Sequence, residues 1–383
     1  MTQYAIVAIG YNRPRSMKRL LKSLTQADYD ADQVTLIISI DNSGDDSVLR
    51  CAEEFSWPFG PKIVKTYPER MGLRRHVLSC GDLVADYEAI AVFEDDIYVS
   101  PNFYQYMKQA VAYYEQDDRI AGISLYQHLW NVHANRPFVP LADSNDVYFV
   151  QFAQSWGQVW MKRQWMEFRK WYDGQGEEFQ ESADIPDYVA SWPATSWLKY
   201  HVRYCIERKK YFVYPYISQC TNFTDAGENF AIPSTGLQVP FQTGIQRKYR
   251  FVPLDGSDTV YDAFWENEKL AGILGLPAEE LCTDLYGVKK NRKNQRYWLT
   301  LEIKDYKIVR SFGLLLKPQE QNILADMEGS QIFLYDTAQV EKNPFHHHVG
   351  RLACSYDFRG DNLSVGMLKN LMVNKVNRQI RHK

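Results

Sequence analysis

The chain reads Ala91-Val92-Phe93-Glu94-Asp95-Asp96-Ile97-Tyr98-Val99 at the end of its first quarter. The apolar start is typical of a strand buried on both faces of a sheet, and the strand ends on three consecutive acids. Buried carboxylates are costly unless a cation pairs with them. Mg²⁺ and Mn²⁺ suit such hard oxygen ligands and keep coordination positions open for phosphate oxygens. The stretch therefore predicts an active site at residues 94–96, with a solvated acidic turn as the alternative.

Strands and helices alternate along the residues before this stretch. Apolar periodicity predicts helices from Pro14 and over 72–85, and strands at 4–9, 34–40, 63–66 and 89–93. This alternation is typical of a parallel sheet with right-handed crossovers, in which ligands bind at the carboxyl ends of the strands. Polar clusters stand at three of those ends, namely Tyr11-Asn12-Arg13, Asp41-Asn42-Ser43 and Glu94-Asp95-Asp96. We expect the three clusters to meet at one edge of the sheet.

The residues after 125 fall into two regions that differ in composition and pattern. Residues 126–241 are aromatic-rich and less regular, and the polar loop 221–236 is a candidate lid, because long irregular loops usually cover a ligand. Beyond Arg247, a basic run and alternating strands indicate a small α+β module. We therefore predict an α/β protein with a mostly parallel central sheet flanked by helices. Its main domain would span 1–245, divided near residue 125, and its C-terminal module 246–383.

Composition argues against some classes of protein. Lys and Arg number 44 against 47 Asp and Glu, so the formal charge is −3 and no global basic field favours a nucleic-acid partner. The six cysteines show no C-x-x-C spacing, which favours reduced thiols. The N-terminus lacks the pattern of a signal peptide, and no apolar run is long enough to span a bilayer. We expect a cytoplasmic protein that binds no nucleic acid.

Residues 92–103 resemble the metal-site strand of GT-A-fold glycosyltransferases. Among these are N-acetylglucosaminyltransferase I and a bacterial group, glycosyltransferase family 2, that builds surface polysaccharides. Other stretches resemble further motifs of the family, and all of them occur in the family's order along the chain. They are the first strand and its turn at 7–13, the uridine-binding strand at 37–41, the helix start Gly72-Leu73-Arg74-Arg75, and parts of the acceptor half at 155–157 and 214–218. The resemblance covers roughly Tyr4 to Phe230. It implies a GT-A domain with a nucleotide-sugar half over 1–125 and an acceptor half over 126–245.

The resemblance assigns a role to each of the three acids. Asp96 would be the direct ligand of Mn²⁺ or Mg²⁺. Asp95 would face the ribose or the water shell of the metal, and Glu94 would face the donor sugar.

It also assigns the residues that bind the nucleotide. Arg13 would contact the diphosphate, and Asp41 would accept hydrogen bonds from the uracil. Asn12 and Arg75 complete this set. Considered without the resemblance, Arg13 could equally pair with Asp41 or Asp45 at the surface.

The general base is the point where the chain departs from the family. N-acetylglucosaminyltransferase I has its base in a Trp-Asp-Asp-Trp segment, whereas residues 192–197 here contain no carboxylate. Asp187, the nearest acid, is the first candidate for a catalytic base and Asp184 the second, followed by Asp225 and Glu228 of the loop. Each could instead be a solvated loop acid.

The resemblance implies a metal-dependent, inverting glycosyltransferase. The donor would be a nucleoside diphosphate sugar, UDP-linked, and the acceptor a growing bacterial surface glycan or a lipid-linked glycan. A metal ion and an arginine would stabilise the charge of the departing diphosphate. One alternative is a nucleotidyltransferase acting on a sugar phosphate, but such enzymes usually carry a glycine-rich phosphate loop, and residues 10–14 offer one glycine. Another is a noncatalytic carbohydrate-binding protein, which would not need Asp96.

The last predicted helix, over 365–380, is basic and amphipathic. It combines apolar residues with five cations, Lys369, Lys375, Arg378, Arg381 and Lys383. Such a helix suits either docking on the core of the protein or peripheral contact with an anionic membrane, here the inner face of the plasma membrane.

Overall fold

The computed structural model describes residues 3–176, 179–227, 234–292, 295–358 and 364–381. Two compact units make up the chain: residues 1–129 with 142–265, and residues 130–141 with 266–383. The predicted domain boundary lay at residue 245, whereas the first unit extends to Trp265, and the segment 130–141 belongs to the second unit.

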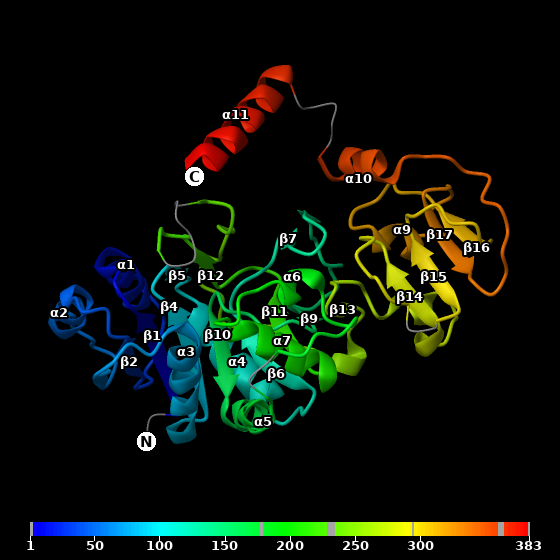
Figure 1. Ribbon diagram of the computed structural model, residues 1–383. Helices are drawn as coiled ribbons and strands as arrows, with labels where there is room; N and C mark the ends of the chain where they lie inside the picture. The colour runs from blue at the N-terminus through cyan, green and yellow to red at the C-terminus, as the bar shows by residue number, and fades with distance from the viewer. Residues whose placement is uncertain (1–2, 177–178, 228–233, 293–294, 359–363, 382–383) are drawn as a thin grey trace. The chain divides into compact units, whose positions relative to one another are not determined.

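A nine-stranded sheet forms the centre of the first unit, in the order β13-β9-β11-β6-β10-β4-β1-β2-β3 (Figure 1). Of its pairings among described residues, five are parallel and three antiparallel. This confirms the predicted α/β class with a mostly parallel sheet. The strands are β1 (Tyr4–Gly10), β2 (Thr35–Ile40), β3 (Lys62–Thr66), β4 (Ala89–Glu94), β6 (Ile120–Ser124), β9 (Val147–Val150), β10 (Gln158–Met161), β11 (Tyr211–Pro215) and β13 (Val260–Tyr261).

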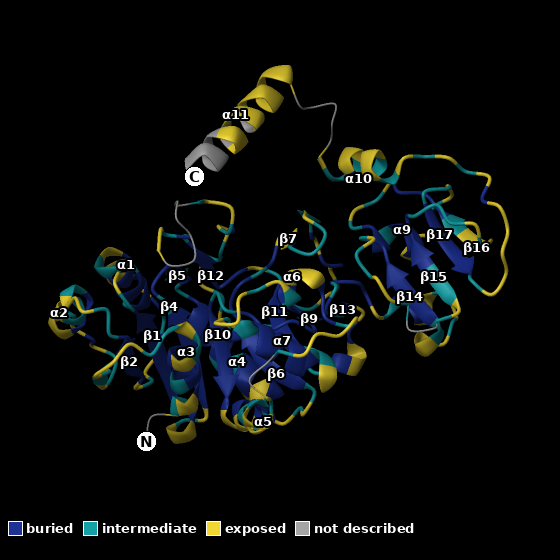
Figure 2. Ribbon diagram, in the orientation of Figure 1, coloured by how far each residue is buried: buried dark blue, intermediate teal, exposed yellow. Residues whose placement is uncertain are grey.

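Helices cover both faces of this sheet, and its strands are largely buried (Figure 2). Ile6 of β1 and Val159 of β10 belong to one apolar core, together with residues of α1 and α4. Trp160, which follows Val159 and points to the other face, stacks on Trp165 of α5 with ring centroids 4.0 Å apart. The helices of this unit are α1 (Pro14–Leu24), α2 (Ser47–Glu54), α3 (Leu73–Gly81), α4 (Phe103–Tyr114), α5 (Lys162–Asp173), α6 (Asp187–Ala190) and α7 (Leu198–Glu207), with 3₁₀ turns at Asp82–Asp86 and Leu254–Gly256.

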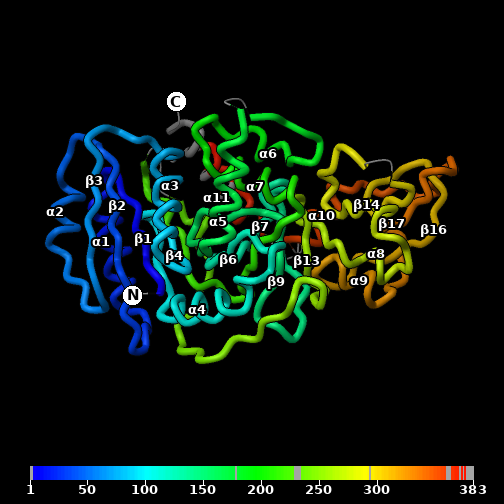
Figure 3. Tube along the Cα trace, turned by 90° about the horizontal axis from the view of Figure 1, so that it is seen from below, coloured from blue at the N-terminus to red at the C-terminus, as the bar shows by residue number. Residues whose placement is uncertain are grey.

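The strand register brings the predicted polar clusters to one edge. The strands β3, β2, β1 and β4 run side by side (Figure 3). In the parallel pairs, Gly10 lies opposite Ile40, and Ile9 lies opposite Glu94. The turns that follow β1, β2 and β4 therefore leave the same edge of the sheet.

Two pairings come from residues far apart in the sequence. Strand β10 inserts antiparallel between β4 and β6. Strands β5 (Ile97–Val99) and β12 (Cys220–Asn222) pair antiparallel, with Asn222 opposite Ile97. The second pairing delivers the segment after β12 to the predicted acids.

The second unit has its own four-stranded sheet, in the order β14-β15-β17-β16, and its own apolar core. The elements are β7 (Trp130–Asn131), β8 (Arg136–Pro137), α8 (Leu270–Ile273), a 3₁₀ turn at Ala278–Glu280, β14 (Leu281–Asp284), β15 (Tyr297–Thr300), β16 (Lys307–Phe312), α9 (Glu320–Leu324), β17 (Ile332–Asp336), α10 (Val349–Phe358) and α11 (Val365–Arg381). Arg136, in the hairpin of β7 and β8, donates to Asp357 from Nε at 2.7 Å and from Nη2 at 3.2 Å.

Among the described residues, no helix combines the length and apolar character needed to cross a bilayer.

Candidate active site

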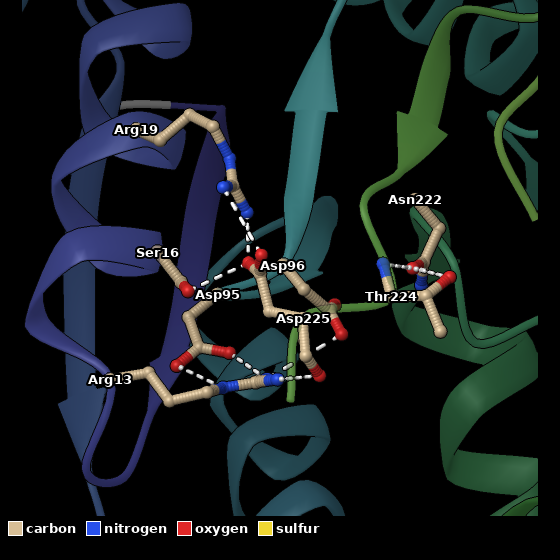
Figure 4. Close-up of polar contacts among 8 residues, drawn as sticks. All are labelled: Arg13, Ser16, Arg19, Asp95, Asp96, Asn222, Thr224 and Asp225. Carbon is tan, nitrogen blue, oxygen red and sulfur yellow. Dashed lines mark hydrogen bonds and ion pairs between the residues drawn. The ribbon is translucent and has the colours of Figure 1, made fainter. Parts of the chain in front are cut away.

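Arg13 joins the end of β1 to the acids that follow β4 (Figure 4). Its guanidinium donates twice to the carboxylate of Asp95, from Nε to Oδ2 at 3.2 Å and from Nη2 to Oδ1. The same Nη2 lies 3.5 Å from Oδ2 of Asp96. Asp95 and Asp96 are buried, at 3% and 7% exposure. One arginine thus lies against two buried carboxylates at the predicted edge.

Burial and mutual repulsion make these acids unusually weak. Burial raises the pKa of Asp95 to about 6, although Arg13 opposes the shift. Burial and the charges of Asp96 and Asp95 also raise the pKa of the neighbouring Glu94 well above its ordinary value. The pKa of Asp96 is raised as well, again chiefly by burial. A single arginine therefore does not compensate the cluster, which favours an additional cation.

Asp225 brings a fourth carboxylate to this cluster. Its side chain accepts hydrogen bonds from Ser16 Oγ at 2.7 Å and from both terminal nitrogens of Arg19, with Nη1 at 3.3 Å. Its backbone carbonyl accepts from Arg13 Nη1 at 3.2 Å. Although burial acts in the opposite direction, the bonds from Arg19 and Ser16 hold the pKa of Asp225 below its usual range.

The segment that carries Asp225 is fixed at several points. The N–H of Phe223 donates to the carbonyl of Asp96 at 2.8 Å, and the guanidinium of Arg19 lies 3.8 Å from the centre of the Phe223 ring. Thr224 has a left-handed backbone, with φ of 48°, and Asn222 Oδ1 accepts its N–H at 2.5 Å. These contacts close the start of the candidate lid against α1. Glu228, the other acid proposed for this loop, lies outside the described residues.

Asp41 directly follows β2 at the same edge and is also buried, at 5% exposure. Its carboxylate accepts backbone N–H groups of Met71 at 2.6 Å, of Gly72 at 2.9 Å and of Asn42 at 2.9 Å. Gly72 precedes α3 with φ of 73°, a conformation that favours glycine. Asp41 therefore holds the turn into α3, and its predicted contact with uracil remains a prediction.

The other predicted nucleotide-binding residues lie around this edge. Asn12 is exposed in the turn between β1 and α1. Arg75 is exposed on the first turn of α3 and points a nitrogen at Met71 Sδ, 3.7 Å away. Neighbouring Arg74 instead donates to the hydroxyl of Tyr200 at 3.1 Å.

The predicted bases lie on a different part of the unit. Asp187 is exposed at the first residue of α6, and Asp184 is half-buried just before it. Helix α6 packs beside α7, away from β4 and β5 (Figure 1). The structure thus groups Arg13, Glu94, Asp95 and Asp96 on one side, and places Asp184 and Asp187 apart from them.

Gly157 packs the acceptor-side motif closely against β4 and β12. Its φ is 82°, and a Cβ atom there would lie 2.7 Å from Cys220 Sγ and 3.3 Å from the Phe93 ring. The adjacent Trp156 is half-buried, and its N–H donates to Gln154 Oε1 at 3.0 Å. Glycine is therefore required between the two halves of the sheet.

A divalent cation fits the donor set around Asp96. Asp96 Oδ1 is buried and has no hydrogen-bond partner among the described residues. When all four are ionised, the carboxylates of Glu94, Asp95, Asp96 and Asp225 exceed the guanidinium charges of Arg13 and Arg19 by two formal negative charges. The described residues hold no group of three or more His, Cys, Asp or Glu arranged for a metal. Mg²⁺ and Mn²⁺ sites of nucleotide enzymes use one or two carboxylates and take further oxygens from phosphates.

Two side chains of this cluster were not predicted from the sequence. Ser16 and Arg19 follow β1 on the first turns of α1, and Ser16 is buried beside Met17. The available signal was a polar residue at a buried position of an otherwise apolar helix face. Their partner Asp225 lies more than two hundred residues further along the chain, so the pattern alone does not identify it.

No protein-family model and no curated protein matches this chain. Solved structures match part of it. The mannosyltransferase PcManGT from Pyrobaculum calidifontis, in complex with GDP-Man and Mn²⁺, is similar over 57% of this chain and 57% of its own length, with 12% identity and a TM-score of 0.36. S. aureus TarS 1-349 in complex with UDP-GlcNAc is similar over 59% of this chain and 60% of its own, with 14% identity and a TM-score of 0.36. The matched part spans less than two thirds of each of those chains.

Proposed function

We propose that this protein is a metal-dependent glycosyltransferase that moves a sugar from a nucleoside diphosphate sugar, UDP-linked, to a hydroxyl group of a glycan. The observation that supports this best is the contact of Arg13 with the buried Asp95 and Asp96 between the ends of β1 and β4. The excess negative charge of this cluster favours a divalent cation, as does Asp96 Oδ1, which has no partner in the described part of the chain. The position of the cluster is where a parallel sheet binds nucleotides.

Each residue of the site would have its own role in binding the sugar nucleotide. Asp96 would hold Mn²⁺ or Mg²⁺ with Asp95 beside it, and the bound ion supplies charge neutralisation for the departing diphosphate. Arg13 would donate to diphosphate oxygens, where its charge counts for more in the transition state than in the ground state. Glu94 would face the donor sugar, while Asp41, Asn12 and Arg75 would bind the nucleoside side.

Inversion requires a base on the face of the sugar opposite the diphosphate. Asp187 is our first candidate and Asp184 the second. Asp225 is a poor base, because its carboxylate already accepts from Arg19 and Ser16 and its pKa is lowered. We assign it a positioning role, since it orients Arg13 through its backbone carbonyl.

The acceptor would be a growing bacterial surface glycan, free or carried on a lipid at the cytoplasmic face of the plasma membrane. Aromatic rings near α6 favour a sugar acceptor, because flat apolar faces stack on sugar rings. Tyr188 is 46% exposed, and its ring centre lies 5.6 Å from that of Trp192.

Two alternatives make different use of the same residues. A nucleotidyltransferase acting on a sugar phosphate would consume a nucleoside triphosphate and release pyrophosphate. A noncatalytic carbohydrate-binding protein would use the aromatic rings and would not need the Asp95–Asp96 charge.

A panel of sugar nucleotides, tested by thermal shift with and without Mn²⁺ and then for nucleotide release, separates the three. We expect a UDP-sugar to raise the melting temperature only with Mn²⁺, and Asp96→Asn to abolish the shift, because a ligand stabilises the folded state according to its affinity. Asp30→Asn is the matched control, since Asp30 is exposed in a turn with φ of 55°, which asparagine also tolerates. Pyrophosphate release, or glycan binding that is indifferent to Asp96→Asn, would instead favour one of the alternatives.

A further inference from the structure

The C-terminal segment differs in charge from the rest of the chain. Residues 364–383 contain five Lys and Arg and no Asp or Glu, whereas the whole chain carries −3. Residues 1–363 therefore carry −8. A segment of +5 at the end of an acidic protein is typical of an electrostatic contact with an anionic partner.

The same segment forms the long helix α11, which exposes apolar side chains. Leu368, Met372 and Val376 recur every four residues and so share one face of the helix, and they are 42%, 70% and 51% exposed. Val365 and Val373 are also exposed, at 83% and 47%. A helix that combines an exposed apolar face with cationic side chains suits the surface of an anionic bilayer.

We propose that α11 is a peripheral membrane anchor that lies flat on a bilayer rich in anionic lipid. Its apolar face would enter the boundary between headgroups and acyl chains, while Lys369 and Lys375 would contact lipid phosphates. At 17 residues the helix is about 25 Å long, which suits contact along the surface. The anionic bilayer is favoured over a second copy of the chain because a copy would bring the same five cations, which repel.

The inference does not depend on the transferase reaction, and its test needs no nucleotide. Full-length protein is floated with phosphatidylcholine vesicles and with vesicles that also contain phosphatidylglycerol. We expect binding to the anionic vesicles alone at about 50 mM salt, and loss of most binding at about 500 mM, where screening shortens the reach of charge.

Two double variants separate the contributions. Lys369→Glu with Lys375→Glu should weaken vesicle binding by about fivefold or more for each cation replaced. Leu368→Gln with Met372→Gln keeps the helix propensity and the charge but should also release the protein. The charge control is Lys248→Glu with Lys342→Glu, at exposed positions outside α11, and should bind as wild type.

Each other outcome overturns the anchor. Equal binding to neutral and anionic vesicles would show that charge does not direct the contact. Failure of the wild type to float with anionic vesicles at low salt would remove the proposal. If Leu368→Gln with Met372→Gln also lowered the melting temperature or split a dimer, the apolar face would belong to the protein's own body or to a second copy.

Discussion

The two halves of the nine-stranded sheet offer different chemistry. At the ends of β1, β2 and β4, buried carboxylates are paired, as Asp95 is with the half-buried Arg13, or held by backbone groups, as Asp41 is. Around α6, by contrast, half-buried and exposed aromatic rings accompany Asp184, just before the helix, and Asp187, at its first residue.

This difference indicates what each half can specify. Buried, paired charges are costly to assemble and are held in one geometry, which suits the constant part of a substrate, a nucleoside diphosphate with its cation. Exposed rings discriminate by shape and stacking, which suits a variable glycan. Changes in the first half should therefore affect nucleotide binding, and changes in the second half should affect turnover and the acceptor.

The largest effect that would sharpen this contrast is expected at Asp187. Asp187→Asn should lower kcat by about 10²- to 10³-fold, because general-base catalysis contributes that order of rate enhancement. The Kd for UDP should not change, as measured by calorimetry. Glu181→Gln, at an exposed position in the loop before α6, is the control. Turnover close to wild type in Asp187→Asn would eliminate this base and direct the test to Asp184→Asn.

The next effect concerns the contact between the halves. Gly157→Ala should lower the free energy of unfolding by about 2–4 kcal/mol, because alanine is strained at φ of 82° and its Cβ would meet Cys220 Sγ at 2.7 Å. Chemical denaturation measures the change. Gly176→Ala, where a Cβ meets nothing within 4 Å, should stay close to wild type. Equal stability of the two variants would contradict the close packing of the halves.

A smaller effect is expected where Arg19 holds Asp225. Both side chains are about a quarter exposed, so solvent screening limits the ion pair to about 1 kcal/mol, and Arg19→Gln should weaken UDP binding by about fivefold. Arg15→Gln, exposed on the same helix, is the control. Unchanged UDP affinity in Arg19→Gln would mean that Asp225 does not position Arg13.

The smallest effect is a pH dependence of the first half. Because the pKa values of Glu94 and Asp95 are raised on folding, their contribution to stability is present below about pH 4 and is lost as pH rises through about 6 for Asp95. A cation needs the ionised carboxylates. The Mn²⁺-induced rise in melting temperature should therefore be several degrees larger at about pH 8 than at about pH 5. A shift independent of pH would argue that Mn²⁺ binds elsewhere.

The local sequence pattern was sufficient to predict the helices and strands near the acids, such as α1 and β4. The helix predicted from Pro14 is α1, and its apolar residues Met17, Leu20, Leu21 and Leu24 are fully buried. The predicted strand at 89–93 is β4, one residue longer. Each of these elements packs through its own periodic residues, so a short window of sequence contains the information.

Pairing between strands far apart in the sequence could not be predicted from the local pattern. The sequence predicts an acceptor-side motif at residues 155–157 and no strand after it, whereas Gln158–Met161 is a strand whose partners begin at Ala89 and Ile123. Asp225 was expected in a lid, and it is β12 pairing with β5 that brings it to Arg19. No local pattern encodes such contacts, because they depend on which distant strand closes the sheet.

The proposed transferase depends on Asp96, which would bind a divalent cation together with a nucleoside diphosphate. Electron paramagnetic resonance of Mn²⁺ titrated into the protein with UDP tests it directly, because free and bound Mn²⁺ give different spectra. We expect about one bound Mn²⁺ per chain for the wild type and for Asp30→Asn, and loss of that binding in Asp96→Asn. Undiminished Mn²⁺ binding by folded Asp96→Asn would contradict it.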